Sequence, residues 1–180
     1  MFTAILKLLD DLPTLLPSAR ADSRLEGLFE SLKRAPNKDV AETLQTEIWE
    51  IWCATPDTTT RTLMQWGMTA LDENRLEVAE QAFSRVVIYD AEFAEGWNKR
   101  ATVRFVMGDF EGSAADVERT LKLEPRHFGA LSGLGQILMR YDEIRGAVRA
   151  FEAALALNPH LGPVAQAVET LRQRLKRSLH

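Results

Sequence analysis

The fold of this chain is decided by one 34-residue stretch, residues 128–161: FGALSGLGQILMRYDEIRGAVRAFEAALALNPHL. Its pattern of large and small packing residues recurs twice upstream at a fixed offset of 34 residues. The positions in register are Leu63, Trp97 and Leu131; Gly67, Ala101 and Gly135; Ala79, Ser113 and Ala147; Phe83, Val117 and Phe151; and Ala91, Pro125 and Pro159. A repeat of this length predicts stacked helical hairpins, which present a surface for binding rather than a catalytic pocket.

Each unit is predicted to contain two antiparallel helices. The first helices are expected over residues 60–73, 94–107 and 128–140, and the second over 76–89, 110–123 and 144–157. Glycine inside a helix costs about 0.5–1 kcal/mol relative to alanine, so Gly67 and Gly135 are best explained by close packing of the two helices. Pro125 and Pro159 end the second helices. The turn of the second unit contains Gly108 whereas that of the third has no glycine, so we expect the two turns to differ in geometry.

These residues resemble the tetratricopeptide repeat, and the resemblance covers Thr60 to His160 as three consecutive units. The third unit matches best, through Leu134, Gly135, Leu138, Ala147, Phe151, Ala154 and Pro159. The second departs from the pattern at Arg100, Arg104, Ser113 and Thr120, where the family has apolar or small residues. The resemblance implies an all-α superhelix of helical hairpins (an α-solenoid) with capping helices at its ends. The units are then residues 60–93, 94–127 and 128–161.

The flanking segments have the amphipathic pattern of capping helices. Residues 23–58 are predicted to form an N-terminal helical hairpin, a degenerate repeat or cap, because Leu25, Leu28, Phe29 and Leu32 share one helical face and Leu44, Ile48, Ile51 and Trp52 another. Residues 162–180 are predicted to form a C-terminal capping helix, with Val164, Val168, Leu171 and Leu175 on its apolar face.

Residues 1–22 allow two interpretations. The apolar residues from Phe2 to Leu16 and the sequence Ala19-Arg20-Ala21 fit a signal peptide, which would make the protein periplasmic after cleavage near Ala21. Asp10 and Asp11 interrupt the apolar run, so an uncleaved amphipathic helix and a cytoplasmic location are favoured. No stretch is long and apolar enough for an integral membrane segment.

Composition excludes several functional classes. The net charge of −4 argues against a nucleic-acid partner, because phosphate recognition needs a basic surface. The chain has one cysteine, Cys53, which we expect to be a buried small apolar residue rather than a nucleophile. His127 and His160 occupy equivalent turns and are interpreted as loop or cap residues. We therefore predict no enzymatic activity, no catalytic residue, no cofactor and no metal site.

In the family that the chain resembles, the first helices of successive units line the concave surface. Carried over to this sequence, the expected partner-binding groove consists of Met64, Met68, Asn98, Thr102, Phe105, Ser132, Gln136, Met139 and Arg140. The apolar members suit side chains of varied shape, and the uncharged polar ones can hydrogen-bond a peptide. Some of the methionines are alternatively ordinary packing residues. Family members that clamp acidic chaperone termini use lysine and asparagine where this chain has Met64, Met68, Gly129 and Ser132, so that partnership is not expected.

The leading hypothesis is therefore a non-enzymatic adaptor that binds an extended peptide or a helix of a partner protein in the concave groove. The alternative is an assembly or export factor of the cell envelope, either periplasmic or held at a membrane surface by its N-terminal segment. A further possibility is a homo-oligomer formed through the terminal helices, whose apolar faces can pack on another copy.

Overall fold

The computed structural model describes residues 2–15 and 22–177, and within these ranges it is helical with no strand. The helices are α1 (Thr3–Asp11), α2 (Arg24–Lys33), α3 (Lys38–Cys53), α4 (Thr58–Asp72), α5 (Leu76–Tyr89), α6 (Ala94–Met107), α7 (Phe110–Leu123), α8 (Phe128–Arg140), α9 (Ile144–Leu157) and α10 (Gly162–Arg177), with a short 3₁₀ turn at Leu12–Thr14. The bounds of the six repeat helices lie within two residues of the expected ones. The predicted all-α architecture of paired helices is confirmed.

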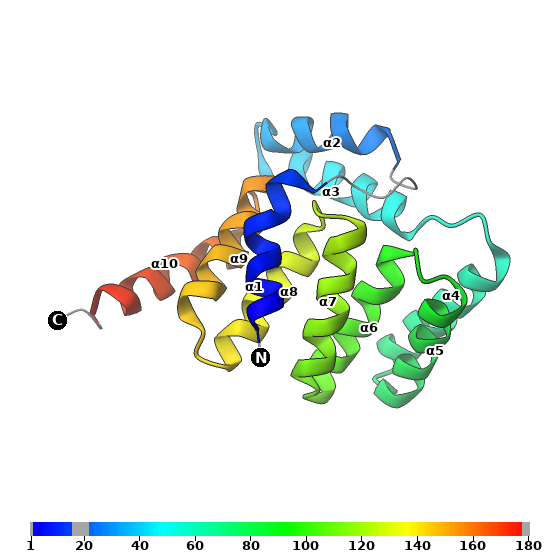
Figure 1. Ribbon diagram of the computed structural model, residues 1–180. Helices are drawn as coiled ribbons and strands as arrows, with labels where there is room; N and C mark the ends of the chain where they lie inside the picture. Colours follow the sequence, from blue (N-terminus) through cyan, green and yellow to red (C-terminus); the bar gives the residue numbers. More distant parts are fainter. Residues whose placement is uncertain (1, 16–21, 178–180) are drawn as a thin grey trace.

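The three repeat units are the antiparallel pairs α4/α5, α6/α7 and α8/α9, which stack side by side (Figure 1). The close packing inferred from Gly67 and Gly135 is present. A Cβ atom at Gly67 would lie 2.5 Å from the ring of Phe83, and one at Gly135 would lie 2.3 Å from the ring of Phe151. Each glycine therefore makes room for the aromatic residue of its own unit.

The turn between the two helices has the same conformation in all three units, so the expected difference in turn geometry is wrong. Asn74, Gly108 and Asp142 stand at equivalent positions and adopt φ angles of 56°, 85° and 59°. In each unit the N–H of the following residue bonds a carbonyl five residues earlier, as in Arg75 to Ala70. Asparagine and aspartate tolerate the left-handed conformation better than other side chains, and here they replace the glycine.

The charged residues that make the second unit unusual form one partly buried network around Asp116. Arg100 donates from Nε and Nη2 to the two carboxylate oxygens of Asp116, at 2.8 and 2.7 Å. Arg104 donates a third hydrogen bond to this carboxylate at 3.0 Å. Arg104 also bonds Glu80 of the first unit at 2.8 Å. The side chain of Asp116 is 2% exposed. The two arginines that depart from the repeat pattern therefore each face a carboxylate, and the contact between Arg104 and Glu80 joins the second unit to the first.

The first unit has a separate core, to which the second unit contributes Val103. Met64, Ala70, Phe83 and Val86 form this buried cluster with Val103 and neighbouring apolar residues, apart from the larger cluster that contains the rest of the core. The first unit thus buries its apolar face without help from the N-terminal hairpin.

The N-terminal hairpin of α2 and α3 does not lie where a cap of the first unit would. Its principal contacts are between α2 and α9 and between α3 and α6. Trp52 of α3 packs on His127 and Phe128, at the start of α8. In Figure 1 the hairpin crosses the ends of the repeat helices, and α4 and α5 lie away from it. The capping expectation is therefore wrong in position, because these aromatic contacts fold the hairpin back over the second and third units.

Helix α1 packs against α7 and α9 (Figure 1). Ile5, Leu8 and Leu9 are buried in the large core cluster, and the side chain of Leu6 fills the space that a Cβ atom at Gly146 would need. The amphipathic pattern is therefore used inside the protein, and this apolar face is not free for a membrane surface. The sequence Ala19-Arg20-Ala21 lies outside the described residues.

Helix α10 closes the other end of the array by packing on α9. Val168 and Leu171 are buried in this contact, and Arg172 pairs with Glu152 of α9 at 2.6 Å. Among the described residues, no helix has the combination of length and apolar character that a membrane crossing requires.

Candidate functional site

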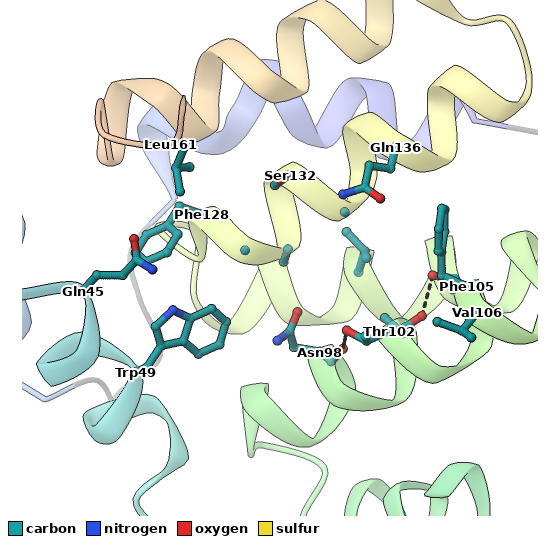
Figure 2. Close-up of a pocket in the computed structure, with 16 residues that line it drawn as sticks. Gln45, Trp49, Asn98, Thr102, Phe105, Val106, Phe128, Ser132, Gln136 and Leu161 are labelled. Carbon is teal, nitrogen blue, oxygen red and sulfur yellow. Dashed lines mark hydrogen bonds between the residues drawn. The ribbon is translucent and has the colours of Figure 1, made fainter. Parts of the chain in front are cut away.

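A half-open cavity of about 450 Å³ lies between α6 and α8, the first helices of the second and third units (Figure 2). The described residues that form its walls are mostly apolar, with uncharged polar side chains among them and no ionisable side chain. The lining residues are Gln45, Trp49, Asn98, Ala101, Thr102, Phe105, Val106, Ser113, Val117, Phe128, Gly129, Ala130, Ser132, Gly133, Gln136 and Leu161. An apolar cavity with a few polar groups is the usual form of a binding site.

The cavity brings together five of the nine residues expected to form the groove: Asn98, Thr102, Phe105, Ser132 and Gln136. They lie on the facing sides of α6 and α8 at intervals of three and four residues, which places them along one face of each helix.

The other four expected groove residues do not line this cavity. Met64 is buried in the core of the first unit and Met68 packs against the same core, as ordinary packing residues do. Met139 is exposed one turn beyond Gln136. The guanidinium group of Arg140 lies over Phe105 and Phe110, at 5.9 and 5.7 Å from the ring centres.

The polar side chains of the cavity differ in how far they are already engaged. Asn98 is buried and donates from its amide to Glu95 at 3.2 Å. The hydroxyl of Thr102 donates to the carbonyl of Asn98 at 3.0 Å. Ser132 and Gln136 make no side-chain hydrogen bond to any described residue, and Gln136 is exposed. These two side chains are the groups that remain available to a ligand.

Helix α3 supplies one end wall of the cavity, a contribution that the repeat pattern does not predict. Trp49 stands over Gly129, where a Cβ atom would come within 2.9 Å of the indole, and Lys99 lies 5.2 Å from the centre of an indole ring of Trp49. Gln45 accepts a hydrogen bond from Asn158 at 2.7 Å. The repeat does not require a glycine near the start of α8, so Gly129 is the feature of the sequence that could have indicated a bulky side chain packed against this helix.

Close to this wall a buried hydrogen-bonded pair, His127 and Glu95, anchors the start of α8. His127 is fully buried, and its Nε2 lies 2.9 Å from Oε2 of Glu95. Its Nδ1 accepts the N–H of Ala130 at 3.1 Å, so Nε2 carries the proton and donates to Glu95. Trp52 stacks on the imidazole with ring centres 4.1 Å apart. His127 is thus the N-cap of α8, as expected, and its imidazole is also the surface on which Trp52 of the hairpin packs.

The carboxylate of Glu95 keeps its charge despite its burial. Loss of solvation by itself would raise its pKa, but the hydrogen bond from His127 and the nearby positive charge of Lys99 outweigh this effect. The pKa of Glu95 is therefore below its ordinary value. This charged group, which accepts two hydrogen bonds at Oε2 and pairs with Lys99 at Oε1, joins α6 to the start of α8.

Cys53 is exposed, so the expectation that it is buried is wrong. Partial loss of solvation and the carboxylate of Glu95 raise the pKa of its thiol to about 11. A thiol with so high a pKa is protonated at neutral pH and is a poor nucleophile. Within residues 2–15 and 22–177, no group of three or more histidine, cysteine, aspartate or glutamate side chains is placed to hold a metal ion.

Comparisons with known proteins agree with this architecture. A family model described as tetratricopeptide repeat matches residues 98–160. A TPR repeat-containing protein of Rhizobium etli is 35% identical over 158 residues, which cover 88% of this chain and 78% of that protein.

Two solved structures share the fold at lower identity. The structure of MamA has a TM-score of 0.63 at 18% identity and covers 90% of this chain and 87% of its own. The first TPR domain of Spaghetti (RPAP3), bound to the HSP90 peptide SRMEEVD, has a TM-score of 0.64 at 17% identity and covers 66% of this chain and 94% of its own.

Proposed function

This chain belongs to the tetratricopeptide repeat family, and we propose that it is an adaptor that holds a segment of a partner protein in the cavity between α6 and α8. The family fold is one of protein interaction, since stacked hairpins form extended concave binding surfaces. The observation that carries the proposal is the half-open, uncharged cavity lined by both first helices, in which the side chains of Ser132 and Gln136 have no hydrogen-bond partner among the described residues.

The cavity suits an uncharged partner segment better than an acidic one. The lining contains no lysine or arginine, which an acidic peptide needs for strong recognition. The peptide bound by the TPR domain of Spaghetti ends in Glu-Glu-Val-Asp, and a ligand of that kind has no matching charge here. The proposed partner therefore presents apolar side chains to Trp49 and Phe105.

Affinity capture from the native host tests this function. The tagged wild-type protein is compared with a Thr102→Glu/Gln136→Glu double variant, which places two charges in the cavity. A Gln81→Glu/Ala115→Glu variant adds the same charge at exposed positions of α5 and α7 and serves as the control.

The proposal predicts a protein that the wild type and the control variant retain and that the cavity variant loses. Circular dichroism of the three proteins checks that they are equally folded. Equal capture by all three would place the interface elsewhere on the molecule.

A further inference from the structure

The hydrogen-bonding capacity of the cavity is too small for an extended segment. An extended chain brings one unpaired N–H and one unpaired C=O per residue, and each must find a partner when it leaves water. Of the polar side chains on α6 and α8 that face the cavity, Asn98 and Thr102 are already engaged inside the protein. Among the uncharged polar residues expected in the groove, only Ser132 and Gln136 have side chains without a hydrogen bond to a described residue. In a helix the backbone N–H and C=O groups hydrogen-bond to one another, so a helical segment needs no such partners from the cavity.

The protein itself fills the neighbouring part of the same surface with a helix. Trp49 of α3 lies against Gly129 of α8 and close to Lys99 of α6, and it forms the end wall of the cavity. Figure 2 shows this indole on the opposite side of the cavity from Phe105 and Gln136. The two repeat helices are thus spaced to accept a helix that inserts an apolar side chain between them, and the open remainder continues this intramolecular interface.

The open part of the groove is long enough for two turns of a helix. Ser132, Gln136 and Met139 follow one another at intervals of four and three residues on α8, and Asn98, Thr102 and Phe105 do the same on α6. Seven residues of helix extend about 10 Å. Val106 lines the cavity and is 56% exposed, and Met139, which does not line it, is 41% exposed, so the apolar surface continues past the cavity along α8. This matches the spacing of apolar residues on an amphipathic helix.

The far end of the groove carries the positive charge of Arg140, which no carboxylate of the described residues neutralises. Arg140 is exposed and lies over two phenylalanine rings, and no described acidic side chain forms an ion pair with it. At the closed end, by contrast, Lys99 pairs with Glu95. A partner thus gains from an acidic side chain only at the end that adjoins Arg140.

We propose that the partner segment is an amphipathic helix with two uncharged apolar anchor residues, spaced by three or four positions, and an acidic side chain at the end that meets Arg140. The first anchor enters the cavity beside Trp49, and the second covers Met139 and Val106. This inference rests on the proposed function, because it names the kind of segment that the same cavity binds.

Selection from a phage-displayed library of random peptides, each long enough for about four helical turns, tests the inference on the full chain. Peptides are selected on the wild-type protein and counter-selected on the Thr102→Glu/Gln136→Glu variant. The selected peptides should carry apolar residues three or four positions apart and an acidic residue beside them. Circular dichroism should show that their helical content increases on binding. Replacing Arg140→Gln should weaken such a peptide by up to roughly fivefold, and Arg145→Gln, an exposed change on α9, should not.

The outcomes separate the two proposals. Peptides that discriminate between the wild type and the cavity variant, but bind without gaining helix or require a free terminal carboxylate, would overturn the helix inference and leave the binding function standing. A selection that yields no peptide able to discriminate between the two proteins would contradict binding in the cavity itself.

Discussion

Replacing Glu95 with glutamine removes a charge that the structure holds fully buried under the N-terminal hairpin, without changing the size of the side chain. The carboxylate accepts from Nε2 of His127 at 2.9 Å and from Nδ2 of Asn98 at 3.2 Å, and it lies 3.2 Å from Nζ of Lys99. Because all three neighbours offer N–H groups, the amide of a glutamine must turn a donor toward at least one of them.

The size of the effect follows from this geometry. Breaking a buried charged pair by removing one partner costs about 3 kcal/mol, at the low end of the usual range because the side chain of Lys99 is 20% exposed and can regain water. For a protein of this size that lowers Tm by about 6–12 °C. Glu92→Gln is the matched control, since its exposed pair with Arg119 is worth under about 1 kcal/mol. Urea denaturation at pH 7 measures both free energies of unfolding.

The pH dependence gives a second check on the same variant. The pKa of Glu95 is lowered in the fold from its ordinary value of 4.5, so its stabilising contribution is fully present above pH 4.5 and is lost as the pH falls through the folded-state pKa. E95Q has no such contribution, and the difference between the two proteins should therefore shrink on acidification. A variant as stable as the wild type at pH 7, or a difference that widens below pH 4.5, would refute the reasoning.

Three further variants or reactions probe other parts of the structure. In α7, Asp116→Ala should lower the free energy of unfolding by about 3 kcal/mol and Glu118→Ala, in an exposed pair, by under about 1 kcal/mol; equal losses in urea denaturation would contradict the network around Asp116. In α1, Leu8→Ala should cost about 2–5 kcal/mol while Lys7→Ala changes stability little, and a fully stable Leu8→Ala protein would mean that α1 does not pack in the core. Cys53 should react with iodoacetamide at pH 7 at least about tenfold more slowly than free cysteine, because its pKa of about 11 leaves little thiolate; an equal rate would contradict that pKa.

The repeat helices were predictable from the sequence because their packing is local. Gly135 and Phe151 lie in one unit and contact each other, so the same pair of residues recurs at the same spacing in the first unit. The periodicity of apolar residues then fixed which face of each helix is buried. The left-handed turn at Asp142 was missed because aspartate replaces the glycine that marks this conformation in the second unit.

The position of the hairpin was not predictable in the same way. It depends on contacts such as Trp52 with His127 and Trp49 with Gly129, which join residues far apart in the sequence and do not repeat in the other units. Amphipathic periodicity shows that α3 has an apolar face but does not identify the surface that this face covers. For the same reason the expected groove included Met64, which the first unit uses for its own core, and omitted Trp49.

A partner segment held in the cavity between α6 and α8 shields both helices from solvent. Hydrogen–deuterium exchange of the protein, alone and saturated with the captured partner, measures this shielding. Binding in the cavity should slow amide exchange along α6 and α8 and in α3 around Trp49, with little change in α4 and α5. Protection confined to α4, α5 or α10, with exchange in α6 and α8 unaltered, would contradict it.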